Sequence, residues 1–213
     1  MNKIKVGIIE DSEVHVAWIA TELMDEQDFE IVSQDALGRK GIASVKLHQP
    51  DIVILDFQLH DMTGLEVAKW IKTQDQNIKI FMLTAHTEIS ILERIISDKN
   101  IDAIAIKGSY YLEENFLLAM KHIADGGTYL DPSLLKKLRD SKNMSGLNTL
   151  TRREFEIFIQ VNTGKSDVQI ANDLCVELSH VKNLKSKISK KTQGQDIADL
   201  LSNLMENANT LTE

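Results

Sequence analysis

The chain has 213 residues and a net charge of −8, with 43% hydrophobic and 26% charged residues. These values are typical of a folded globular protein and exclude a disordered chain. The single cysteine, Cys175, excludes an internal disulfide framework and favours a reducing compartment. No apolar run reaches the roughly 18 residues that a membrane-spanning helix needs, so we expect a cytoplasmic protein without membrane contact.

Short apolar runs alternate with longer amphipathic segments from Lys3 to about Gly127. The runs predict five strands, at 4–9, 29–34, 51–56, 78–83 and 101–106. Helical periodicity predicts a helix after each strand, at 12–26, 39–48, 63–74, 87–98 and 112–125. Five successive strand–helix units predict an α/β fold with a five-stranded, doubly wound parallel sheet of the flavodoxin-like kind.

The second part of the chain has no strand signals. Pro132 and the polar segment "DSKNMSGLN" predict a short helix and a linker over 128–149. Four helices are predicted after that, at 151–163, 166–174, 177–192 and 196–206. The sequence therefore predicts two domains, an α/β domain at 1–127 and an all-α domain at 150–213.

Polar side chains follow the strands of the predicted sheet. Glu10 and Asp11 come after the first strand, Asp56 ends the third, Thr84 follows the fourth and Lys107 follows the fifth. Because the carboxyl ends of parallel strands meet at one edge of a sheet, we expect these side chains to converge. Three carboxylates repel one another unless a cation lies among them, and Mg²⁺ prefers such oxygen ligands. Asp56 is then a nucleophile that can carry phosphate as an acyl phosphate.

In type, order and spacing these residues resemble the receiver domain of two-component response regulators, over residues 1–126. The resemblance implies that a histidine kinase phosphorylates Asp56 and that Thr84 and Lys107 sense the phosphoryl group. It also implies a regulator that accepts phosphate and not a turnover enzyme. The implied Mg²⁺ ligands are Glu10, Asp11, Asp56 and the main-chain carbonyl of Gln58.

Two other interpretations of these residues are open. Asp11 or Ser12 could serve only as a helix cap, with Thr84 and Lys107 as unrelated surface groups. A phosphatase of the haloacid-dehalogenase type would need a second aspartate where Gln58 stands. The ordered set of five residues on successive strand ends favours the receiver.

The chain departs from the receiver pattern in the loops around this edge. His60 replaces the usual proline, although Gly64 is retained. Ile104 replaces the usual switch aromatic, for which Tyr110 and Tyr111 are the candidate substitutes. His86 is expected to lie near the site, where it could tune dephosphorylation.

The third predicted helix of the all-α part, 177–192, carries five lysines and one glutamate, a local charge of +4. Its apolar residues Leu178, Val181, Leu184 and Ile188 have helical spacing and are expected to face the core. A cationic helix face on an anionic protein indicates attraction to phosphates, although charged runs are by default solvated surface.

This half resembles the LuxR-type (NarL-type) helix-turn-helix domain, through "LTRRE" (150–154), "GKS" (164–166), "VK" (181–182) and "DIADLL" (196–201). The resemblance implies a recognition helix at 178–191 in the major groove of promoter DNA and a dimerisation helix at 196–206. The implied DNA contacts are Lys182, Asn183, Lys185, Lys187 and Lys190.

Together the two halves predict a transcriptional response regulator. Phosphorylation of Asp56 by a cognate histidine kinase is expected to promote a homodimer that binds double-stranded promoter DNA. The alternative is a phosphorylation-independent DNA-binding regulator, or a protein-interaction adaptor, that uses the receiver as a dimerisation scaffold. The substitutions at His60 and Ile104 favour that alternative.

Overall fold

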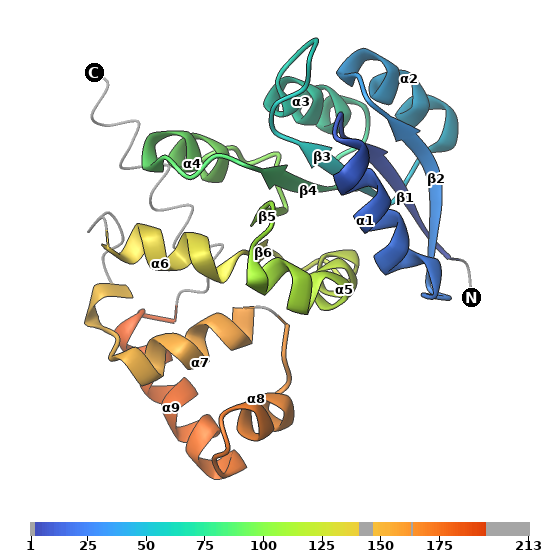
Figure 1. Ribbon diagram of the computed structural model, residues 1–213. Coiled ribbons are helices and arrows are strands. Elements are labelled where there is room, and N and C mark those ends of the chain that lie inside the picture. The colour runs from blue at the N-terminus through green and yellow to red at the C-terminus, as the bar shows by residue number, and fades with distance from the viewer. Residues whose placement is uncertain (1–2, 141–146, 163, 195–213) are drawn as a thin grey trace.

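The computed structural model describes residues 3–140, 147–162 and 164–194. A parallel α/β sheet occupies one end of the molecule and a small helical bundle the other, with α5 and α6 between them (Figure 1). No helix in the described ranges is both long enough and apolar enough to cross a membrane.

All strands of the sheet run parallel, in the order β2-β1-β3-β4-β5-β6. The predicted parallel α/β fold is thereby confirmed. The five expected strands are β1 Ile4–Ile9, β2 Phe29–Asp35, β3 Ile52–Asp56, β4 Lys79–Thr84 and β5 Ala103–Ile106.

The strand count was wrong by one, because a short sixth strand, β6 Tyr129–Leu130, extends the sheet. It lies in the predicted linker and pairs with β5 through Ala103↔Tyr129 and Ile104↔Leu130. Two residues are too few to give a periodic signal, so the sequence pattern could not predict this strand. Its effect is to cover the edge of β5.

Helices cover both faces of the sheet (Figure 1). In β3 the side chains alternate: Ile52 and Ile54 belong to one buried core, while Val53 and Leu55 belong to the other. This strand is therefore dry on both faces, as its unbroken aliphatic run indicates. The helices of this half are α1 Glu13–Met24, α2 Gly38–His48, α3 Gly64–Gln74, α4 Ile89–Ile96 and α5 Tyr110–Ala124.

The helical half follows α6 Pro132–Asp140 and the 3-10 turn η1 Leu147–Thr149. Its described helices are α7 Arg152–Asn162, α8 Asp167–Asp173 and α9 Leu178–Lys191. The Ser166 hydroxyl caps α8 in a reciprocal capping box with Gln169, as the sequence "SDVQ" indicates. The predicted helix at 196–206 lies outside the described residues.

The apolar stripe of α9 differs from the prediction at one position. Val181 is fully buried and Ile188 is 6% exposed, but Leu178 is 38% exposed, so its assignment to the core was wrong. Leu178 is the first residue of α9, whereas the buried Val181 and Ile188 lie further along the helix.

The two halves share one hydrophobic cluster. Leu134 and Leu135 of α6 are fully buried, and they belong to the same cluster as Leu130 of β6 and Leu147 of η1. Phe155 of α7 is in it as well. Helix α6 therefore joins the sheet to the bundle by apolar packing, beyond its covalent connection.

Candidate functional site

Three carboxylates meet at the carboxyl edge of the sheet. Glu10 and Asp11 follow β1, and Asp56 ends β3. One oxygen of each lies within 4.8 Å of the others. Glu10 and Asp56 are buried, at 2% and 4% exposure. A set of converging oxygen donors of this kind suits a hard divalent cation.

Lys107 lies among these carboxylates. Its Nζ is 2.9 Å from Asp56 Oδ1, and it is 2.8 and 2.9 Å from the two oxygens of Glu10. Its side chain is only 8% exposed. A β-sheet hydrogen bond from the Lys107 N–H to the Thr84 carbonyl, 2.8 Å long, fixes the residue just past the end of β5. The two buried carboxylates therefore share one ammonium, which offsets only part of their negative charge.

The environment of Asp56 makes its carboxylate harder to ionise. Burial raises the pKa of Asp56 above its ordinary value, and the neighbouring charge of Glu10 raises it further. The hydrogen bond and charge of Lys107 oppose this rise in pKa, as does the Gln58 N–H, which donates to Asp56 Oδ1 over 3.3 Å. The net direction is upward, which identifies a desolvated carboxylate at the mouth of the sheet.

Thr84 ends β4 beside this group. Its side chain is fully buried, and its hydroxyl accepts the His86 N–H at 3.0 Å.

Gly64, at the start of α3, is the retained glycine, and a Cβ there would lie 2.3 Å from the Asp56 carbonyl oxygen. The helix therefore approaches the backbone of Asp56 so closely that only glycine fits.

A cavity of about 250 Å³ opens beside these residues, lined in part by Asp56, Gln58, His60, His86 and Lys107. His60 Nδ1 lies 2.6 Å from the Asp11 carboxylate, and His86 Nε2 lies 2.9 Å from the amide oxygen of Gln58. Only His86 was predicted to lie near the site. The position of His60, four residues after Asp56, also indicates that it lies close to this carboxylate.

The loop after β3 is held by Asp61. The two oxygens of this carboxylate accept the N–H groups of Gly38 and Arg39 at 2.7 and 3.0 Å. These hydrogen bonds lower the pKa of Asp61 below its ordinary value. Leu37, the N-cap residue of α2, has no side-chain acceptor, so Asp61 supplies the missing cap from another loop.

No aromatic ring takes the place of the switch residue within the described part of β5. Ile104 is buried in the core and pairs with Met82 and Leu130. Tyr111, one proposed substitute, instead contacts Lys136 of α6 through both its hydroxyl and its ring. Tyr110, the other substitute, is 67% exposed.

Helix α6 also contacts the loop that follows β4. The Nζ of Lys137 donates to the Thr87 carbonyl at 3.3 Å, three residues after Thr84. Asp131, fully buried before α6, accepts the N–H of Ile106, which precedes Lys107. The linker helix is thus in contact with the neighbours of both Thr84 and Lys107.

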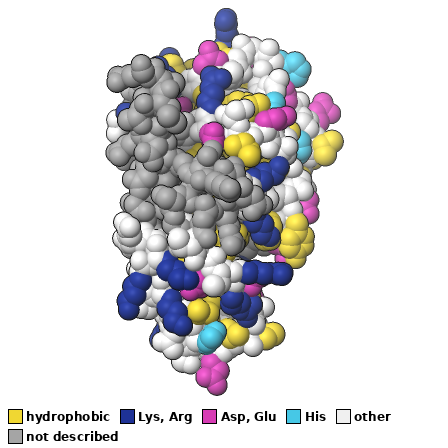
Figure 2. Space-filling view, turned by 90° about the vertical axis from the view of Figure 1, so that its left-hand side faces the viewer, with side chains coloured by type: hydrophobic (Ala, Val, Ile, Leu, Met, Phe, Trp, Pro, Cys, Tyr) yellow, Lys and Arg dark blue, Asp and Glu magenta, His cyan; other side chains and the backbone are white. Residues whose placement is uncertain are grey.

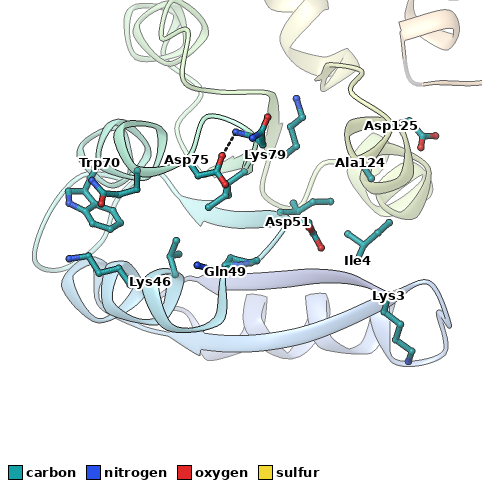
Figure 3. A pocket seen from close by; sticks show the side chains of 16 residues that line it. Lys3, Ile4, Lys46, Gln49, Asp51, Trp70, Asp75, Lys79, Ala124 and Asp125 are labelled. Atoms are coloured by element: carbon teal, nitrogen blue, oxygen red, sulfur yellow. Dashed lines mark hydrogen bonds between the residues drawn. The ribbon is translucent and has the colours of Figure 1, made fainter. Parts of the chain in front are cut away.

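A larger hollow, about 900 Å³, lies at the opposite edge of the sheet (Figure 3). Figure 3 shows Lys3, Lys79, Asp51 and Asp125 among its lining side chains, so charges of both signs surround it. Asp51 accepts the Lys5 N–H at 2.7 Å and serves the start of β1. This hollow does not contain the converging carboxylates, and we do not assign it as the site.

The second candidate surface is the outer face of α9. Lys182, Asn183, Lys187 and Lys190 are all exposed there. Figure 2 shows Lys and Arg side chains gathered over the helical half of this face of the molecule. Helix α9 packs chiefly on α7 and α8, and these four residues lie on the part of its surface that this packing leaves exposed.

Two lysines of α9 have carboxylate partners. Lys185, a predicted DNA contact, is 2.6 Å from Asp167 of α8. Lys191 is 2.6 Å from Glu154 of α7, whose pKa this contact lowers to about 2. Lys191 therefore ties the end of α9 to the start of α7, and it was not among the predicted DNA contacts.

Residues 6–107 match the family model of the response regulator receiver domain. With the carboxylate cluster and Lys107 at the carboxyl edge of the sheet, this match identifies the α/β half as a response regulator receiver domain. Over nearly its whole length the chain is similar to response regulators, as the resemblance of its second half to the LuxR/NarL type predicts.

The relatives match nearly the whole chain. The response regulator protein VraR of Staphylococcus aureus (strain Mu3 / ATCC 700698) is 29% identical over 195 residues, which cover 91% of this chain and 92% of VraR. A structure of Salmonella typhimurium RcsB aligns with a TM-score of 0.61 at 19% identity, covering 99% and 100% of the two chains. A structure of an RcsB–DNA complex has a TM-score of 0.60 at 20% identity, covering 96% and 98%. At these identities the structures establish a shared fold.

Proposed function

We propose that this protein is a transcriptional regulator that is phosphorylated on Asp56 by a histidine kinase and then binds promoter DNA as a dimer. The observation that carries the proposal is the Lys107 ammonium, 2.9 Å from Asp56 in a cluster of three carboxylates. It supports the proposal because a desolvated carboxylate, a cation and a buried threonine lie together at one edge of the sheet. The protein accepts the phosphoryl group once and does not act as a turnover enzyme.

Glu10, Asp11 and Asp56 would hold Mg²⁺, together with the main-chain carbonyl of Gln58. When bound, the ion supplies positive charge that offsets the negative charge of an incoming phosphoryl group. Asp56 provides the attacking oxygen and keeps the phosphoryl group as an acyl phosphate. Lys107 pairs with the added negative charge, which is about −2 near neutrality.

The conformational effect of phosphorylation would be transmitted from Asp56 through Thr84 and Lys107. If these residues shift toward the phosphoryl group, the backbone that follows them shifts as well. Helix α6 contacts the backbone after Thr84 through Lys137, which donates to the Thr87 carbonyl. Asp131, directly before α6, accepts the N–H of Ile106, the residue before Lys107. A change at Asp56 would therefore bias the packing of α6, and with it the relation between the receiver and the DNA-binding half.

The exposed basic face of α9 is the proposed DNA surface. Lys182 and Asn183 would reach base edges, and Lys187 and Lys190 would bind phosphates. Two of the similar solved structures are of RcsB bound to DNA, which supports the same role for this bundle. The localisation that fits such a regulator is the cytoplasm.

The test uses the full chain, the Asp56→Ala variant and beryllofluoride with Mg²⁺. Sedimentation should show that the treated wild type dimerises more tightly than the untreated protein, and genome-wide footprinting should show that it gains discrete sites. The Asp56→Ala variant should show neither response. Equal dimerisation and equal footprints of all samples would refute phosphorylation control.

A second candidate is DNA binding without phosphorylation. It is favoured by the open basic face of α9, which does not need to be uncovered by a movement of the receiver (Figure 1). In that case the untreated wild type and Asp56→Ala would occupy the same discrete genomic sites. The footprinting experiment therefore separates the two candidates.

A further inference from the structure

Lys185 differs from the other proposed DNA contacts because it already has an anionic partner. Its Nζ lies 2.6 Å from Asp167 Oδ1, and the two side chains are 38% and 27% exposed. Within the described part of the chain, Lys182, Lys187 and Lys190 form no ion pair. Lys185 lies three residues after Lys182, so the two occupy neighbouring positions on α9.

From this contact we infer that Asp167 is an internal competitor of the DNA backbone for Lys185. The inference rests on the proposed DNA binding of α9. In the free protein the Asp167 carboxylate satisfies the Lys185 ammonium. A DNA phosphate must either displace the carboxylate or bind beside it.

Both routes weaken the attraction of DNA to this part of α9. Displacement removes a charge-assisted hydrogen bond that the free protein already has. Binding beside Asp167 places two anions within a few ångströms, well inside the screening length of about 8 Å at physiological salt. The pair is partly exposed, so DNA can reach Lys185 and the competition is direct.

The consequence concerns specificity. Phosphate contacts supply affinity for any sequence, whereas base contacts distinguish one sequence from another. An acid that occupies one phosphate-binding lysine lowers the sequence-independent part of the affinity. The binding that remains depends more on base contacts such as that proposed for Lys182.

The chain offers a matched control on the same helix. Asp173, the last residue of α8, pairs with Lys165 at 2.7 Å. Asp167→Asn and Asp173→Asn change the net charge equally, but only the first releases a lysine of α9. Since Ser166 caps α8, neither substitution removes the cap.

The experiment measures binding of the full chain to a fluorescent duplex of mixed sequence over a series of KCl concentrations. For Asp167→Asn we expect roughly three- to tenfold tighter binding at low salt, and a slope of log K against log salt that is steeper by about 0.9, the value for one additional phosphate contact. Asp173→Asn should keep the wild-type slope. The double variant Asp167→Asn/Lys185→Gln should lose the gain in slope, and circular dichroism should show that each variant is folded.

Other results would overturn the inference in ways that can be told apart. Equal gains for Asp167→Asn and Asp173→Asn would mean that only net charge matters. An unchanged slope for Asp167→Asn would mean that Lys185 does not bind phosphate. If the wild type binds no duplex at low salt, the proposed DNA binding itself fails, and the inference fails with it.

Discussion

Lys107 reaches Asp56 at 2.9 Å, and the same ammonium lies 2.8 Å from Glu10. The three side chains are at most 8% exposed. Two buried carboxylates thus share a single cation, which lies just past the end of β5. We therefore expect the stability of this edge of the sheet to depend on Lys107 and on a divalent cation bound by the carboxylates.

Lys107→Ala should therefore destabilise the receiver domain most when no metal is present. Removing one partner of a buried ion pair costs about 3–5 kcal/mol, because the remaining charge is uncompensated. Added Mg²⁺ should restore part of this loss, since it offsets the same carboxylates. Urea unfolding with and without MgCl₂ measures both effects. Lys3→Ala, on an exposed lysine before β1, is the control, and an equal response of both variants to MgCl₂ would contradict the prediction.

The His86–Gln58 hydrogen bond should lengthen the lifetime of the phosphoryl group. It joins the loops after β3 and β4, both of which line the cavity beside Asp56. Without it we expect freer access of water and roughly fivefold faster dephosphorylation, the effect of about 1 kcal/mol. Decay of the acyl phosphate in His86→Ala can be followed by phosphate-affinity electrophoresis. His48→Ala, in the last turn of α2, should decay at the wild-type rate.

Asp131 should be essential for the attachment of α6. Its buried carboxylate accepts the N–H groups of Ile106 and Ser133, at 3.3 and 2.7 Å. Asp131→Ala leaves both donors without this acceptor, and we expect a loss of about 2–4 kcal/mol. Hydrogen exchange should show the loss of protection at Ile106 and at the start of α6. Protection there equal to that of an Asp125→Ala control would contradict the role of Asp131.

Acid should destabilise the helical half through Glu154. The pKa of this group falls from 4.5 to about 2 in the folded protein, chiefly because Lys191 donates to it. Folding therefore favours the carboxylate, and its stabilisation is complete above pH 4.5 and is lost as the pH falls from 4.5 toward 2. Thermal melts of the wild type should approach those of Glu154→Gln over this range. At neutral pH the variant should be less stable by about 1–3 kcal/mol.

If the melting temperatures of the wild type and Glu154→Gln differed by the same amount at every pH, this linkage would be contradicted. The variant Lys191→Ala provides a second check, because it removes the main cause of the lowered pKa. Its acid sensitivity should be smaller than that of the wild type.

The convergence of Asp56 and Lys107 could be predicted because it follows from topology. Once the strands are parallel and in order, their carboxyl ends must meet, whichever side-chain rotamers the residues adopt. The roles of these residues in binding phosphate and metal stay predictions. The structure confirms the parallel sheet, which the aliphatic runs of the strands predict.

Contacts between side chains from different elements could not be predicted in this way. The pairing of Lys185 with Asp167, and that of His60 with Asp11, depends on local loop geometry and rotamer choice. Neither has a periodic signal in the sequence. Leu178 was misassigned because helical spacing gives the direction of a side chain but not whether a neighbouring element covers the first residue of the helix.

Strand β6 has a practical consequence for dissecting the molecule. A receiver shortened at residue 127, where the sequence pattern ends, would lose both β6 and Asp131. The edge of β5 would then present unpaired backbone groups beside an apolar surface that normally meets Leu134 and Leu135. Such a fragment would be prone to self-association, and dimers formed through this edge would be an artefact of truncation. A fragment that extends through α6 keeps the strand paired.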